Sequence, residues 1–108
     1  MIIAVAGPYS ADTEEKKEIN LKNLNVVGAK LLELGHVPII GINAALRVIE
    51  QSNTVDKNKG IMDISMAVLN CCEALLIIGE SPGALKEKFY MKNLGRPIFH
   101  SINEVMKI

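Results

Sequence analysis

The chain has 108 residues, a length typical of one domain, and its twelve basic and twelve acidic side chains cancel. Hydrophobic residues make up 49% and charged residues 22%, which excludes an intrinsically disordered chain. Zero net charge and an aromatic content of only 4% argue against long nucleic acid as a partner, because its binders need basic surfaces and stacking platforms. We therefore expect one domain over residues 1–108.

The chain begins with a predicted strand and a long helix. Residues 2–7 form a compact apolar run that is typical of a buried parallel strand. Asp12 is the expected N-cap of the helix, because Glu15 follows three residues later as in a capping box. Gly35 is the expected stop after Leu34.

The middle of the chain predicts a second strand, a short helix and a loop. Residues 37–40 are apolar and form the expected strand, and Asn43 is the expected cap of a helix that runs to Ile49. Residues 51–60 are polar and aperiodic, which predicts a loop of the kind that often binds a ligand or covers a site.

The second half repeats the alternation. The expected elements are a helix over 60–72, a buried strand over 74–78, a helix over 81–94, a strand over 98–99 and a terminal helix over 103–108. Strands that alternate with helices predict a three-layer α/β/α fold with a four- or five-stranded parallel sheet, Rossmann-like or flavodoxin-like, in the order 2-1-3-4. Ligands bind such sheets at the carboxyl ends of the strands.

Several classes of site and location are disfavoured by the sequence. Cys71 and Cys72 are adjacent and lack the CxxC spacing of a zinc or redox site, and His36 and His100 show no metal-ligand spacing, so we expect no metal and no cofactor. No apolar run approaches a membrane span, and the first residues lack the basic region of a signal peptide. We expect a soluble, cytoplasmic protein that does not associate with membranes.

The loop after the first strand contains one candidate functional side chain. Its residues 7–10 (GPYS) match neither a GxGxxG fingerprint nor a P-loop. Tyr9 either packs over the start of the following helix or presents its hydroxyl at the mouth of the crevice. Gly7 and Pro8 beside it are further candidates for contacting a substrate.

The helix over 81–94 carries the strongest chemical signal. Ser81 and Gly83 begin it, and a helix N-terminus suits an anion such as phosphate, although a simple N-cap and a turn glycine explain both residues equally. Glu87 shares a helix face with the apolar Ala84 and Met91. A carboxylate on an apolar face is costly unless it is used or reaches water at the edge of the face, so Glu87 is either a crevice carboxylate or a solvated edge residue.

A second acid could come from the preceding helix. Asp63 and Asp56 are the candidates, although a carboxylate near a helix start also has a simple electrostatic explanation. Ser65 shares the apolar stripe of Ile61 and Leu69, so its hydroxyl either bonds the helix backbone or faces the site.

Three segments together resemble the nucleoside 2-deoxyribosyltransferase-like superfamily, in particular its small members. They are residues 6–10 (AGPYS), residues 34–40 (LGHVPII), and the stretch from Cys72 to Ile98, which contains an S-x-G-x-x-x-E motif and ends in GRPI. The resemblance covers nearly the whole chain in the right order. Where the superfamily usually has Asp, this chain has Glu73, and the acid that handles the base is not securely aligned.

The resemblance implies roles for individual residues. Glu87 would be the nucleophile, Tyr9 would help to hold the nucleophile and the sugar, and Ser81 with Gly83 would bind the 5′ end of the sugar or its phosphate. Asp63 is the candidate for protonating the base, with Ser65 as its neighbour. The implied reaction is cleavage or transfer of an N-glycosidic bond in a nucleoside or nucleoside 5′-monophosphate.

Two other interpretations remain open. The Glu73 difference and the few polar residues in the crevice favour a non-catalytic domain that binds or senses a nucleotide, and an interaction domain without a small ligand is the third. A homodimer, as in the resembled superfamily, would help so short a chain to enclose a ligand. The first long helix and the apolar Met62 and Met66 are its candidate interface.

Overall fold

The computed structural model describes residues 1–106 and contains one parallel sheet. Its strands are β1 (Ile2–Ala6), β2 (Val37–Ile39), β3 (Ala74–Ile77) and β4 (Ile98–Phe99). They are ordered β2-β1-β3-β4, and every neighbouring pair runs parallel. The predicted α/β class, the four strands and their order 2-1-3-4 are thereby confirmed.

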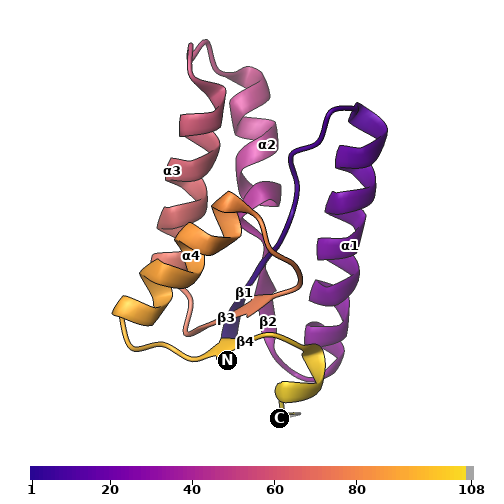
Figure 1. Cartoon of the computed structure of the whole chain (residues 1–108), viewed down its shortest axis with the longest axis vertical. Helices are drawn as coiled ribbons and strands as arrows, with labels where there is room; N and C mark the ends of the chain where they lie inside the picture. Colours follow the sequence, from indigo (N-terminus) through magenta and orange to yellow (C-terminus); the bar gives the residue numbers. More distant parts are fainter. Residues whose placement is uncertain (107–108) are drawn as a thin grey trace.

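Within residues 1–106, four helices cover the sheet and its carboxyl edge. They are α1 (Glu14–Glu33), α2 (Gly41–Gln51), α3 (Lys57–Asn70) and α4 (Pro82–Asn93), followed by a short 3₁₀ turn, η1 (Ile102–Glu104). Figure 1 shows α1 on one side of the sheet and α4 on the other, while α2 and α3 form a hairpin that extends beyond the carboxyl ends of the strands. None of the helices in the described part of the chain is both long and apolar enough to cross a membrane.

The alternation of side chains along β1 divides the core into two halves. Ile3 and Val5 point to the side where α1 contributes the buried Leu24 and Leu31. Ala4 and Ala6 point to the opposite side and pack in a second cluster with residues of α3 and α4, including Leu69 and Met91. Successive residues of a strand face opposite sides of a sheet, so a strand that is buried on both faces is apolar throughout.

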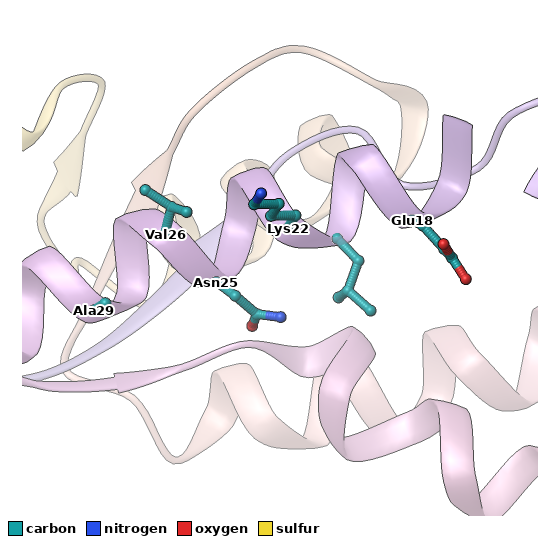
Figure 2. Close-up of a pocket in the computed structure, with 6 residues that line it drawn as sticks. Glu18, Lys22, Asn25, Val26 and Ala29 are labelled. Carbon is teal, nitrogen blue, oxygen red and sulfur yellow. The ribbon is translucent and has the colours of Figure 1, made fainter. Parts of the chain in front are cut away.

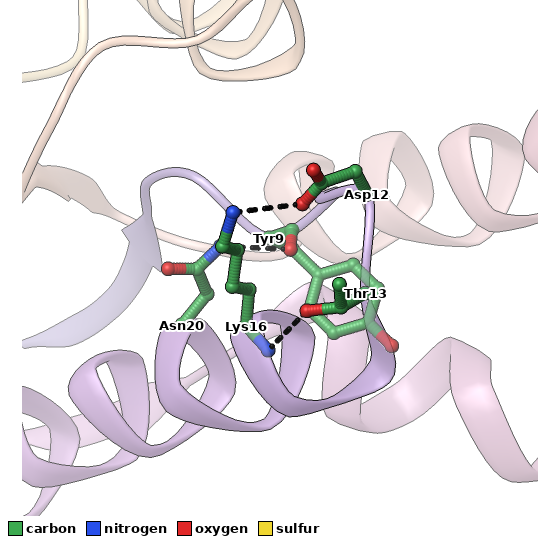
Figure 3. A network of polar contacts seen from close by, with 5 residues as sticks. All are labelled: Tyr9, Asp12, Thr13, Lys16 and Asn20. Atoms are coloured by element: carbon green, nitrogen blue, oxygen red, sulfur yellow. Dashed lines mark hydrogen bonds and ion pairs between the residues drawn. The ribbon is translucent and has the colours of Figure 1, made fainter.

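The start of α1 differs from the prediction by one residue. Thr13, and not Asp12, is the N-cap, since its Oγ1 accepts a hydrogen bond of 3.2 Å from the Lys16 amide. Asp12 instead accepts a hydrogen bond of 3.0 Å from Lys16 Nζ (Figure 3). A threonine at the cap removes the predicted capping box, because Glu15 is then only the second helical residue.

The hairpin of α2 and α3 begins and ends elsewhere than predicted. α2 starts at Gly41 with Ile40 as its N-cap and no side-chain cap, whereas Asn43 lies inside the helix and donates to Asn25. α3 starts at Lys57, because the Asp56 side chain accepts from the Lys59 amide at 3.0 Å. The predicted loop over 51–60 is therefore much shorter, and its second half is helical.

The C-terminal segment contains less helix than predicted. Instead of a helix over 103–108 there is the short turn η1, after which Val105 is extended, and residues 107–108 lie outside the described residues. Arg96 connects this end of the chain to α3: its Nη1 donates to the carbonyl oxygens of Leu69, Asn70 and Cys72 at 3.1, 3.0 and 2.7 Å. These carbonyls lie at the last turn of α3 and just beyond it, where helical partners run out, so Arg96 caps the C-terminus of α3.

Candidate active site

A cavity of about 690 Å³ lies at the carboxyl ends of β1 and β3. Its wall comes from the loop after β1, the first residues of α1, α2 and α4, the end of α2, and one face of α3. This volume falls in the range of sites for small molecules, and the position is the one expected for a ligand of a parallel α/β sheet.

The structure brings together seven of the eight site residues that the sequence suggested. They come from three separate parts of the chain and line one cavity: Gly7, Pro8, Tyr9, Ser65, Ser81, Gly83 and Glu87. The loops after β1 and β3 approach closely here, because a Cβ on Gly7 would lie 2.6 Å from the Ile78 Cγ1 atom. Glycine at this position therefore permits the packing that joins the two loops.

Asp63 is the predicted site residue that does not line the cavity. It lies on the exposed face of α3, where its carboxylate accepts a hydrogen bond of 2.7 Å from Lys59 Nζ, one turn earlier. Ser65, two residues further on, is buried and lines the cavity. Residues two apart on a helix point in nearly opposite directions, so Ser65 and Asp63 cannot both face the site.

Glu87 is the titratable group whose position stands out. It lies on α4 between the buried Ala84 and Met91, one turn away on either side, and it is itself partly buried. Burial raises the pKa of the Glu87 carboxyl from 4.5 to about 7. Within residues 1–106 no ion pair or hydrogen bond engages this carboxyl, so a ligand is free to contact it.

The N-terminus of α4 borders the same cavity. Ser81 caps the helix, since its Oγ accepts a hydrogen bond of 3.1 Å from the Ala84 amide, and Pro82 occupies the first helical position. The amide of Gly83 belongs to the first turn and has no acceptor within the helix. Gly83 itself lines the cavity, and a Cβ built on it would lie 3.5 Å from Met62 Cε, an ordinary contact distance.

Tyr9 lies between the core and the cavity. Its ring packs against the core cluster on the α1 side and also lines the cavity. Its carbonyl oxygen accepts a hydrogen bond of 2.9 Å from Asn20 Nδ2, which ties the loop to α1 (Figure 3). The loop that carries Tyr9 is therefore held at both sides, by α1 and by Ile78.

Charged residues at the cavity mouth were not identified from the sequence. Glu14 pairs with Lys17 at 3.2 Å, and both residues line the cavity. Glu50 also lines it and pairs at 2.7 Å with Arg47, which lies outside the lining. Lys57 also lines it and is exposed. The available signal was positional, because these two acids and two lysines all lie in helices that flank the carboxyl ends of the strands.

The other sequence candidates lie away from the cavity or play structural roles. Glu73 precedes β3, at the amino end of the sheet, and accepts a hydrogen bond of 2.8 Å from the Ile2 amide. His36 is buried, and its ring nitrogens lie within hydrogen-bond distance of the Met1 amino group and the Met106 carbonyl oxygen. Met62 lines the cavity and Met66 packs against the core, and both are partly buried; their role in a homodimer interface stays a prediction.

A second, more open hollow of about 400 Å³ follows the outer side of α1 (Figure 2). One helix supplies its whole lining: Glu18, Leu21, Lys22, Asn25, Val26 and Ala29. In the part of the chain that the structure describes, no strand ends at this hollow, and its two ionisable residues, Glu18 and Lys22, are exposed. The cavity that contains Glu87 is therefore the better candidate for chemistry.

Searches with the sequence do not add a family. No protein-family model and no curated protein matches the chain. Within residues 1–106 there is also no group of three or more His, Cys, Asp and Glu side chains that could hold a metal ion. The assignment of function therefore depends on the geometry of the cavity and on the resemblance of its motifs.

Proposed function

We propose that the chain cleaves or transfers the N-glycosidic bond of a nucleoside or nucleoside 5′-monophosphate, with Glu87 as the nucleophile. The observation that carries this proposal is the partly buried, unpaired Glu87 carboxyl in a cavity of nucleotide size. Its occurrence in the S-x-G-x-x-x-E motif supports the kinship with nucleoside 2-deoxyribosyltransferase-like proteins that the sequence suggested.

The arrangement of the cavity supports a division of roles. The Gly83 amide and the positive end of the α4 dipole suit a phosphate or a 5′-hydroxyl, while Glu87 lies one turn further along the same helix. A ligand held by its 5′ end at Gly83 would present its sugar ring towards Glu87. Tyr9, on the loop after β1, would contact the sugar from another wall of the cavity.

The proposed chemistry proceeds through a covalent intermediate. The Glu87 carboxylate attacks the anomeric carbon as the bond to the base breaks, through an oxocarbenium-like transition state. Water then attacks the anomeric carbon and releases the carboxylate; a second base takes the place of water in a transfer reaction. A nucleophile must be ionised, and since the pKa of Glu87 is about 7, the rate of the first step should rise with pH up to that value.

The test is a screen of nucleosides and their 5′-monophosphates for release of free base, with the wild type and Glu87→Gln side by side. We expect release by the wild type and a loss of at least about 1,000-fold in Glu87→Gln. Glu18→Gln on the exposed face of α1 is the matched control and should retain the wild-type rate.

Tyr9→Phe separates a role in the site from a role in packing, because it removes only the hydroxyl. We expect weaker activity with a nearly unchanged melting temperature. An equal rate in the wild type and Glu87→Gln would refute the proposal. Nucleotide binding without release of base over hours would instead identify a non-catalytic binding domain.

A further inference from the structure

The cavity differs from a two-carboxylate glycosidase site in how its acids are arranged. Such an enzyme places a second carboxyl opposite the nucleophile to protonate the leaving group. Among residues 1–106, three acids line the cavity, and of these only Glu87 is free of a partner; Glu14 is held by Lys17 and Glu50 by Arg47. Asp63, the acid that the sequence suggested for this role, pairs with Lys59 on the outer face of α3.

A neutral base is a poor leaving group unless it is protonated, and a positioned general acid contributes about 10²- to 10⁴-fold to such a step. A base that already carries a positive charge leaves as a neutral molecule and needs no proton. A cavity in which only the nucleophile is an unpaired acid is therefore better suited to a positively charged base than to a neutral one.

Two lining residues also favour a cation directly. Glu87 is a carboxyl in apolar surroundings between Ala84 and Met91, and a positive charge next to it would offset the cost of ionising it there. Tyr9 lines the same cavity, and the face of an aromatic ring attracts a planar cation.

Resting on the proposed function, we infer that the preferred substrates are N-glycosides whose base is a cation, such as the pyridinium ring of a nicotinamide nucleotide. The Glu87 carboxylate oxygen forms a bond to the anomeric carbon, and the C–N bond breaks with its electron pair going to the ring nitrogen. Neutral nicotinamide departs without a proton. Water then adds its oxygen to the anomeric carbon, the ester bond breaks, and the proton of the water passes to the released carboxylate or to solvent.

The experiment compares nicotinamide mononucleotide with its reduced form, which has the same sugar and phosphate but an uncharged ring. Binding is measured by calorimetry, and release of base is measured for nicotinamide mononucleotide and inosine 5′-monophosphate. We expect the oxidised form to bind at least about tenfold more tightly than the reduced form, and this preference to disappear in Glu87→Gln. After correction for the uncatalysed rates, release of nicotinamide should exceed release of hypoxanthine by at least about 100-fold.

The outcomes separate this inference from the proposed function. Equal corrected release of both bases, without a preference for the oxidised form, would overturn the inference and leave the N-glycosidase proposal intact. Tight, Glu87-dependent binding of the oxidised form without release of any base would overturn the catalytic proposal but support recognition of the cation. Glu18→Gln should behave as the wild type in each measurement, and a cation preference that persists in Glu87→Gln would exclude Glu87 as its source.

Discussion

The unusual surroundings of Glu87 predict that its ionisation destabilises the folded chain. Burial raises the pKa of the carboxyl from 4.5 to about 7. Since a tenfold change in an acid equilibrium corresponds to about 1.4 kcal/mol, ionised Glu87 lowers the free energy of unfolding by about 3 kcal/mol. Glu87→Gln keeps the shape of the side chain and removes the charge, so it should recover this amount wherever the wild-type carboxyl is ionised.

The direction of the pH dependence follows from proton binding. Between pH 4.5 and about 7 the folded state holds the proton of Glu87 while the unfolded state has lost it, so stability falls as the pH rises through this window. Above pH 7 the loss from this group is complete. We therefore expect Glu87→Gln and the wild type to have similar stabilities at pH 4, and the variant to be more stable by about 3 kcal/mol at pH 8.

Urea denaturation, followed by circular dichroism at several pH values between 4 and 8, measures this difference directly. Circular dichroism is suitable because the chain contains no tryptophan. Glu18→Gln is the matched control: its side chain is exposed, and we expect its stability to differ from that of the wild type by a constant amount across the range. Parallel pH profiles for Glu87→Gln and the wild type would show that Glu87 is solvated, and would refute the reasoning.

Three further predictions concern the elements around the cavity. Arg96→Met should lower the free energy of unfolding by about 2 kcal/mol, because it leaves the carbonyls at the end of α3 without their charged donor. Urea denaturation measures the loss, and a value below about 0.5 kcal/mol, typical of a surface substitution, would contradict the cap. Gly41→Ala should lower the free energy of unfolding by about 1–3 kcal/mol, since the new Cβ would lie 2.8 Å from the Oγ and 3.1 Å from the Cα of Ser65. Adding Ser65→Ala removes the hydroxyl but not the Cα, so it should recover only part of this stability. Full recovery would show that the contact with the Ser65 backbone is unimportant. Ser81→Ala should lower the melting temperature through a loss of about 1 kcal/mol, and Ser81→Asp should restore it, whereas equal losses in both variants would argue against capping.

The sheet was predictable because its strands are short and apolar throughout. Residues 74–77 have no polar alternative, and a strand buried on both faces fixes the three-layer arrangement. The helix starts were harder to predict, because several residue types can cap. α2 begins at Gly41 without a side-chain cap, whereas Asn43, the nearest residue of a capping type, lies inside the helix. α3 begins with the polar run Lys57–Lys59, which lacks the apolar period by which a helix is recognised.

The sequence predicted a site residue well where its position depends on a single helix or loop. It predicted less where the position depends on how several elements pack together. The helical period alone placed Glu87 with Ala84 and Met91, and the structure has all three on the inner side of α4. The same period sets Asp63 opposite Ser65, so the geometry disfavoured the role that the resemblance suggested for Asp63. The rim residues Glu50 and Lys57 depend on how α2 and α3 pair, which no local pattern specifies. Whether a second copy of the chain completes the cavity stays a prediction.

The position of Glu87 between two buried core residues has a practical consequence for engineering the cavity. Ala84 and Met91 share its helix face, so substitutions that repack this part of the core would also displace the carboxyl. The opposite walls of the cavity carry no such constraint from α4, since they are supplied by side chains such as Leu46 and Ile61 on the α2–α3 hairpin. A mutant library directed at those walls would vary the shape and polarity of the cavity while the Glu87 carboxyl keeps its position.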